Sequence, residues 1–186
     1  MKRSDLHELH YITPIQNVPS IMEHGLLCLH EAKRLNHTSV AMQEIQEIRA
    51  KITIPGGKPL HSYVNLYICA RNPMMYKRAA QHKSLCVLRV SPEVLDLPGV
   101  VIADGNAASA YTGFWPSELG FEKIDLDLVF AESGGQIIIK SSNGTKPVSS
   151  ARRSWCPRRL ILALSRVRTF RVRRARNYWR NQASDW

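Results

Sequence analysis

The sequence contains no apolar run long enough to cross a bilayer, and its first ten residues, MKRSDLHELH, turn polar too early for a secretory signal. It also has few cysteines. Cys28, Cys69, Cys86 and Cys156 lie far apart, and no two have the CxxC spacing of a zinc site or a redox pair. These absences favour a cytoplasmic protein with free thiols, no disulfide framework, no structural metal and no membrane contact.

Several common nucleotide-binding and hydrolytic motifs are missing as well. The seven histidines are scattered, and none has HExxH or another metal-ligand spacing. The chain has no GxGxxG fingerprint, no Walker loop and no GxSxG elbow. The usual signatures of zinc peptidases, Rossmann dehydrogenases, P-loop NTPases and α/β-hydrolases are therefore all absent.

Acidic residues are almost absent from the end of the chain. Residues 1–145 carry 14 Lys or Arg and 14 Asp or Glu, whereas residues 146–186 carry 12 basic residues and the single acid Asp185. The net charge of +11 and the pI near 9.9 therefore describe a tail and not the main body. A chain of 186 residues with this imbalance is expected to be one domain followed by a basic tail.

The stretch Pro59–Arg78 predicts a buried strand that runs directly into a helix. Residues 62–70 are apolar, aromatic and β-branched, as in a buried strand. Asn72 is a good N-cap, and Pro73 suits the first helical position. Arg71, beside free backbone N–H groups at a helix start, makes this junction a candidate anion site. A capped core junction with a solvated arginine explains the same residues, and the junction alone does not decide between the two.

Local patterns predict the other elements. Asn17 is expected to cap a short helix that Gly25 ends in the left-handed conformation, and Thr38 or Ser39 is expected to cap a second helix. Residues 107–122 indicate a shaped loop rather than an element. The remaining strands are expected at residues 6–13, 84–90, 99–103 and 124–131.

Two arginines and two turns are the candidate ligand-binding features. Arg49 and Arg71 flank the two central helices, and either guanidinium suits a pyrophosphate, although most arginines in proteins are solvated. Gly56-Gly57 suits a phosphate-binding turn, and Asp104-Gly105-Asn106 suits the binding of a ribose or a base edge. A plain turn also explains each of these two segments.

The order of several motifs resembles that of the DarT family of DNA ADP-ribosyltransferase toxins. The most specific match runs from Leu60-His61 through Asn65-Leu66-Tyr67 to Ala70-Arg71-Asn72-Pro73-Met74-Met75-Tyr76. The other matching segments are, in chain order, Tyr11-Ile12-Thr13, Asn17-Val18-Pro19-Ser20-Ile21, His24-Gly25-Leu26-Leu27, Ser39-Val40-Ala41, Ile45-Gln46, Arg49, Asp104-Gly105-Asn106-Ala107-Ala108 and Asp127-Leu128-Val129-Phe130-Ala131-Glu132. Together they cover about residues 6–132.

This resemblance implies an α+β fold of the ADP-ribosyltransferase type, a split and mostly antiparallel sheet with helices packed on it. It implies a transferase that takes NAD as substrate, releases nicotinamide and attaches ADP-ribose to a base in single-stranded DNA. It also implies a toxin, paired with a macrodomain antitoxin that removes the modification. We expect residues 1–136 to be an incomplete domain of this kind, residues 137–186 to be a basic tail, and the protein to be a monomer.

The resemblance also assigns roles to individual residues. Tyr11, Ile12 and Thr13 would lie against NAD with Ser20 nearby, residues 38–51 would form the NAD-binding element, and residues 105–150 would present the DNA base. Arg49 would contact NAD and take part in catalysis. The residues expected to contact DNA are Arg71, Tyr76, Tyr111 and Trp115, the last two with Phe114 as aromatic surfaces for stacking. Packing within the loop explains these aromatic residues equally well.

One part of the family pattern is missing. The family's catalytic glutamate lies in a late strand that reads Ala-Glu-Val-Leu-Val-Pro, but the corresponding segment here is Arg152–Pro157, RRSWCP, and no acid occurs between Glu132 and Asp185. The codons GCG GAG GTC TTG GTG CCC encode the family's segment. Read one base later, the same bases encode RRSWC and a codon that begins CC. The hypothesis is therefore a frame shift near residues 133–137, which places Arg153 where the glutamate belongs.

Two consequences follow from this hypothesis. The reaction builds up positive oxocarbenium character on the ribose, and a positively charged arginine at that point opposes it. This chain should therefore be impaired as an enzyme. An out-of-frame tail should also leave the sheet without its late strands and with an unpaired edge. The alternative is a native basic tail in a non-catalytic protein that binds nucleic acid through its phosphates.

Overall fold

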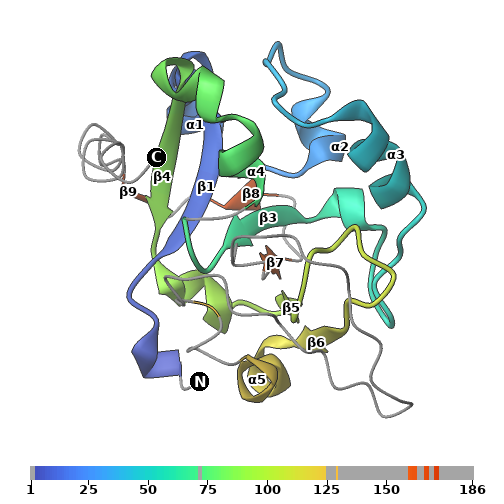
Figure 1. The fold of residues 1–186 in the computed structure, drawn as a ribbon. Coiled ribbons are helices and arrows are strands. Elements are labelled where there is room, and N and C mark those ends of the chain that lie inside the picture. Colours follow the sequence, from blue (N-terminus) through green and yellow to red (C-terminus); the bar gives the residue numbers. More distant parts are fainter. Residues whose placement is uncertain are drawn as a thin grey trace.

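Strand β1, Leu9–Pro14, organises the sheet because it pairs on both sides. It runs antiparallel to β4, Leu85–Val90, over its whole length, and to β3, Val64–Tyr67, with His10 opposite Tyr67. The computed structural model describes residues 3–70, 73–124, 129, 159–162, 166–167 and 170–171. Figure 1 shows β1 and β4 side by side, with β3 leading from them toward the other half of the sheet.

The main sheet has seven strands in the order β6-β5-β7-β3-β1-β4-β9, and every pair of neighbours is antiparallel. β2 and β8 form a separate two-stranded sheet. The strands not yet introduced are β2 Leu26–Leu27, β5 Val101–Ala103, β6 Phe114–Pro116, β7 Arg159–Leu162, β8 Arg166–Val167 and β9 Phe170–Arg171. Antiparallel pairing with helices off the sheet confirms the expected α+β class.

The expectation that the sheet lacks its late strands is wrong for the part of the tail that the structure describes. β7 lies between β3 and β5, with Leu66 opposite Leu160 and Ile102 opposite Leu160 on its other side. The inner edges of β3 and β5 carry backbone N–H and C=O groups that need partners, and an apolar segment such as Arg159–Leu162 supplies them in an extended conformation. The described segment Arg159–Leu162 of the tail therefore takes part in the fold.

Within the described residues, five short helices accompany the sheet: α1 Val18–His24, α2 Leu29–Ala32, α3 Gln43–Ala50, α4 Pro73–Lys77 and α5 Ser117–Gly120. Gly25 ends α1 at the predicted position with a positive φ of 84°, but its ψ of 179° differs from that of the left-handed αL conformation. Asn17 precedes α1 as predicted, but its side chain makes no capping hydrogen bond. Among the residues that the structure describes, no helix has the length and apolar character of a membrane span.

Two predicted boundaries are wrong. The second helix begins at Gln43 and not after Thr38 or Ser39, so residues 37–42 form an irregular segment with a bend at Ala41 ahead of α3. The segment 107–122, predicted to be a loop, contains β6 and α5, and Ser117 Oγ donates a hydrogen bond of 2.9 Å to the carbonyl of Leu95. β6 forms because β5 offers it a free edge, a long-range cause that local sequence does not show.

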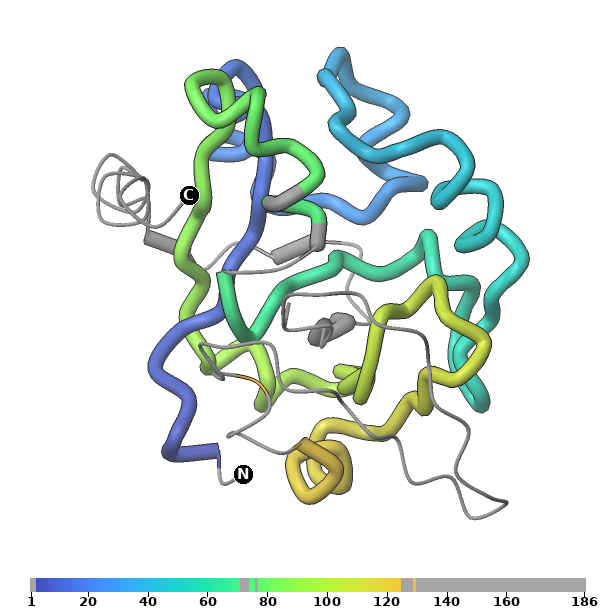
Figure 2. The backbone as a smooth tube through the Cα atoms, in the orientation of Figure 1, coloured from blue at the N-terminus to red at the C-terminus, as the bar shows by residue number. Residues whose placement is uncertain are grey.

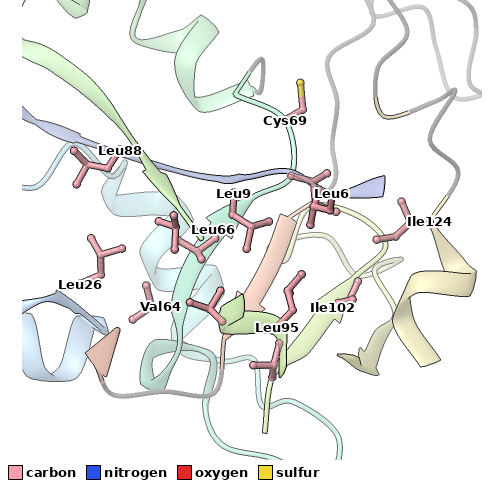
Figure 3. Close-up of a cluster of buried hydrophobic side chains, with 14 of the residues drawn as sticks. Leu6, Leu9, Leu26, Val64, Leu66, Cys69, Leu88, Leu95, Ile102 and Ile124 are labelled. Atoms are coloured by element: carbon pink, nitrogen blue, oxygen red, sulfur yellow. The ribbon is translucent and has the colours of Figure 1, made fainter. Parts of the chain in front are cut away.

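The main core is formed by side chains of strands β1, β3, β4 and β5. Leu9 of β1, Val64 and Leu66 of β3, and Ile102 of β5 are each no more than 1% exposed, and Figure 3 shows these side chains gathered in one cluster. Burying an aliphatic side chain of this size stabilises a fold by about 1.5–3 kcal/mol. The alternation along β3 also leaves Asn65 and Tyr67 for the opposite face, which contributes to the cleft described next.

Candidate functional site

A cleft of about 250 Å³ opens at the end of β1. Its walls come from β1, from residues 37–42, from α3, and from β3 with the 3-10 turn η3, Leu60–Ser62, that leads into it. Residues of α4 and Arg78 complete one side. A cavity of this size with mixed apolar and polar walls suits part of a small molecule, not a folded partner.

The structure brings four of the predicted ligand-binding residues into this cleft and leaves others out. Tyr11, Ile12, Thr13 and Arg49 all line it. Ser20, on α1, does not line it. Tyr11, Ile12 and Thr13 are separated by more than thirty positions from Arg49 in sequence, so their meeting in one cleft is a property of the fold.

The four predicted DNA contacts have different outcomes. Tyr111 is 92% exposed and lies outside the cleft. Trp115 is half-buried on β6, outside the cleft, with the Nζ of Lys123 5.0 Å from its ring centroid. Arg71 and the side chain of Tyr76 lie outside the described residues. A role for these four residues in binding DNA therefore stays a prediction.

Arg49 places a positive charge inside the cleft. It lies near the end of α3 and is only 5% exposed, so its guanidinium is largely shielded from water. Charge interactions are stronger in such a setting than on an open surface. A buried guanidinium in a cavity wall suits an anionic ligand group, because its fork of N–H donors matches phosphate and carboxylate geometry.

His61 is a neighbour of Arg49 that local sequence did not single out. It lies on η3, is 9% exposed and lines the same cleft. Burial lowers the pKa of its imidazole, and the charge of Arg49 lowers it further, followed by smaller effects of His30 and Lys33. His61 is therefore a neutral polar group at neutral pH and adds no positive charge to that of Arg49.

Asn17 ties residues 37–42 to the end of β1. Its Nδ2 donates to the carbonyl of Thr38 at 2.8 Å, and its Oδ1 accepts from the Thr38 amide at 3.0 Å, so one side chain pairs with both backbone polar groups of Thr38. Nδ2 also lies 3.3 Å from the Oγ1 of Thr13. These contacts, made across 21 positions, explain why Asn17 does not cap α1.

Arg78 holds the same segment from the other side. Its Nη2 donates a hydrogen bond of 2.6 Å to the carbonyl of Val40. Figure 2 shows the chain around residues 36–42 and the chain after α4 rising along the same side of the molecule, although they are far apart in sequence. The wall of the cleft formed by residues 37–42 is therefore fastened at two points.

Changing Asn17 to alanine is expected to loosen this wall. The Thr38 amide loses its acceptor, and a net hydrogen bond contributes about 0.5–1.5 kcal/mol, so its hydrogen exchange should speed up by roughly three- to tenfold. The matched control is Gln16→Ala, which removes a hydrogen bond to the Thr38 hydroxyl and leaves both backbone bonds of Thr38 to Asn17 in place. Equal exchange of the Thr38 amide in the wild type and in Asn17→Ala would show that Asn17 does not hold the segment.

The lining of the cleft contains no acidic side chain among the residues that the structure describes. Its polar members are hydroxyls, amides, imidazoles and three cations, Arg49, Lys77 and Arg78. The segment 152–157, where the resemblance places the catalytic carboxylate, lies outside the described residues. The described part of the cleft can thus hold an anion but supplies no carboxylate to stabilise a developing positive charge.

Two buried histidines predict a loss of stability in acid. Burial lowers the pKa of His10 and of His61 below the ordinary value of 6.5, so the unfolded chain binds protons that the folded chain does not. The free energy of unfolding should therefore fall as the pH drops below about 6.5. Urea denaturation at several pH values should give a shallower decline for the His10→Gln, His61→Gln double variant, and an unchanged slope would contradict this account.

Comparison with known proteins gives a consistent assignment. The model of the family described as "ssDNA thymidine ADP-ribosyltransferase, DarT" matches residues 10–149. A DNA ADP-ribosyl transferase–DNA ADP-ribosyl glycohydrolase fusion protein of Thermosipho africanus is 37% identical over 110 residues, 56% of this chain and 28% of that protein. A DNA ADP-ribosyl transferase of Thermus sp. strain 2.9 is 40% identical over 70 residues, 37% of this chain and 34% of that protein. The matches thus span about a third of the length of these relatives.

Solved structures show the same fold. Thermosipho africanus DarTG in complex with ADP-ribose superposes with a TM-score of 0.68 at 27% identity, over 87% of this chain and 41% of that one. Thermus sp. 2.9 DarT in complex with ADP-ribosylated single-stranded DNA gives a TM-score of 0.61 at 21% identity, over 85% of this chain and 76% of that one. The fold is therefore the expected ADP-ribosyltransferase type, and the chain, matched by the family's model over most of its length, belongs to the DarT family.

Proposed function

We propose that this chain is the ADP-ribosyltransferase domain of a DarT-type toxin, with NAD as its substrate and a base of single-stranded DNA as the acceptor. The observation that carries the proposal is the meeting of Thr13 and Arg49 in one cleft of a DarT-family fold. A relative at 27% identity has been solved with ADP-ribose, the part of NAD that such an enzyme transfers. The family's description names thymidine as the base, which we adopt as the first acceptor to test.

The described residues supply binding and positioning. Arg49 would pair with the pyrophosphate, where a buried guanidinium acts most strongly. The segment 37–42, held by Asn17 and Arg78, would close over the ligand from one side. The transfer itself breaks the bond from ribose C1′ to nicotinamide and forms a bond from C1′ to the base, which gives up a proton. Single-stranded DNA suits this step because no base has to be extracted from a duplex.

We propose further that this chain is impaired. The leaving of nicotinamide gives the ribose oxocarbenium character, and a carboxylate next to the sugar stabilises that charge. The described lining has no acidic residue, and the sequence has none between Glu132 and Asp185. A frame shift near residues 133–137 accounts for both the missing glutamate and the excess of arginine in residues 137–186. The domain proper would then be residues 1–136, with β7 as a strand that the altered tail still provides.

The proposal includes a partner. The Thermosipho relative joins its transferase to a DNA ADP-ribosyl glycohydrolase in one polypeptide. The name of the second enzyme indicates that it removes the ADP-ribose that the first attaches. A separate or fused macrodomain antitoxin is the corresponding partner for this chain. We propose that the transferase domain itself acts as a cytoplasmic monomer.

The experiment is to incubate the chain with NAD and a thymidine-containing single-stranded oligonucleotide, and to weigh the product. We expect a slow gain of one ADP-ribose that requires both NAD and the oligonucleotide. A different result would favour the alternative of a non-catalytic protein that binds DNA through its basic tail. In that case the oligonucleotide binds in a salt-sensitive manner, and its mass does not rise with NAD. The mass would have to stay unchanged even after long incubation at high protein concentration, and also with a frame-restored chain.

A further inference from the structure

A ring of contacts runs around the cleft, and each residue that forms it lines the cleft. On one side Thr13 contacts Asn17, and Asn17 holds the backbone of Thr38 with two hydrogen bonds. On the other side the hydroxyl of Tyr67, on β3, donates to the Sδ of Met74, on α4, at 3.6 Å. The pairing of β1 with β3 in the sheet joins these two sides at one end.

Arg78 joins the two sides at the other end and so closes the ring. Its backbone is attached to α4, because its amide donates to the carbonyl of Met74 at 3.1 Å. Its half-buried side chain reaches 38 positions back along the chain to the carbonyl of Val40, at 2.6 Å. A hydrogen bond from a charged donor is stronger than one between neutral groups. The wall formed by residues 37–42 is therefore held against α4 by the guanidinium of Arg78.

The closed ring limits the size of what the cleft can enclose. The cavity measures about 250 Å³, whereas pockets that bury a drug-sized ligand measure roughly 300–1,000 Å³. NAD consists of two joined nucleotides and is larger than such a ligand, so the cleft cannot enclose it unless part of the wall moves. Thr38 is held by two bonds and Val40 by the one from Arg78, so the wall should pivot near Thr38 and open at Val40.

We propose that Arg78 is a positioning residue that acts as a latch: it controls how fast a dinucleotide enters and leaves the cleft, and it does not hold the ligand itself. This inference rests on the proposed function, which supplies the dinucleotide. Breaking the bond from Arg78 to Val40 frees residues 39–42 to swing outward, and remaking it closes the wall over the ligand. The same bond forms before and after binding, so its loss speeds entry and exit by the same factor and leaves the affinity nearly unchanged.

The test is a stopped-flow measurement of the association and dissociation rates of carba-NAD with the wild type and Arg78→Met. We expect both rates to rise by roughly three- to tenfold, the effect of one lost hydrogen bond, while Kd stays within about twofold. Arg78→Lys keeps the charge without the guanidinium fork and should raise both rates by a smaller factor. Lys83→Met is the matched control and should change neither rate, because it removes an exposed cation of the 3-10 turn Ala79–Ser84 that does not line the cleft.

A second measurement needs no ligand. Hydrogen exchange of the amides in residues 39–42 should be roughly three- to tenfold faster in Arg78→Met than in the wild type, and unchanged in Lys83→Met. Equal exchange in the wild type and in Arg78→Met would overturn the latch.

The rates decide between the latch and other roles of Arg78. Faster dissociation alone, with a matching loss of affinity, would make Arg78 a ligand contact and overturn the latch, and so would rates equal to those of the wild type. Should Arg78→Met fail to fold, the same rates measured on Arg78→Lys decide. A folded wild-type chain that does not bind carba-NAD would overturn the proposed function, and hydrogen exchange would still show whether Arg78 holds the wall, so the two failures can be told apart.

Discussion

Restoring the second reading frame near residues 133–137 is expected to raise the rate of NAD-dependent oligonucleotide modification by roughly a hundredfold or more. The restored frame replaces Arg153 with the glutamate of the family's late strand. A carboxylate placed where positive charge develops stabilises the transition state, and removing one such electrostatic contact typically costs about 10²–10³ in rate. The measurement is the initial rate of ADP-ribose transfer, by mass spectrometry, for this chain and the restored chain at equal concentration.

The control for this experiment is the restored chain with glutamine in place of the glutamate at position 153. It has the restored strand and backbone but lacks the negative charge, so it separates catalysis from folding. We expect its rate to fall back toward that of the present chain. If the restored chain modifies DNA no faster than the present one, or if the encoding DNA has no open second frame giving the glutamate strand, the frame-shift hypothesis is wrong.

Changing Arg49 to methionine is expected to weaken the binding of ADP-ribose by roughly 10- to 100-fold. Arg49 is 5% exposed and lines the cleft, and a hydrogen bond to a charged group contributes about 1.5–3 kcal/mol. Methionine keeps the length and apolar stem of the side chain, and replacing a buried charge by an apolar group is often neutral for folding. The measurement is a calorimetric titration of the wild type and the variant with ADP-ribose.

Arg49→Lys is the informative companion variant. Lysine keeps the positive charge but has no planar fork of donors, so its affinity should lie between those of the wild type and Arg49→Met. Affinity equal to the wild type in both variants would remove Arg49 from the ligand site. A large fall in Tm for Arg49→Met would instead show that the arginine acts mainly in folding.

Elements with strong local signals could be predicted from the sequence. The run LCVLRV gave β4 almost to the residue, and Pro19 with Gly25 marked the two ends of α1. The motif order also placed Thr13 and Arg49 in one site, because the resemblance carries information about three-dimensional neighbours that local patterns lack. Where an element depends on nearest neighbours in sequence, residue propensity and the helix-ending glycine located it, although neither predicted capping side chain caps its helix.

The features that were missed depend on contacts between distant segments. Asn17 looks like a helix cap, and only the proximity of Thr38 shows that it fastens the cleft wall. β7 forms because β3 and β5 leave a gap of its width in the sheet. His61 appears ordinary in sequence, and its importance comes from its burial beside Arg49. At each of these positions a contact with a distant segment, and not the local propensity, decides what the residue does.

The central claim is that this chain builds a working dinucleotide cleft whose catalytic carboxylate is missing. The most direct test is a calorimetric titration of the present, unaltered chain with carba-NAD, which can be bound but not cleaved. We predict saturable binding at one site per chain, and binding that is at least roughly tenfold weaker in Arg49→Met. The absence of saturable binding by a chain shown to be folded would contradict it.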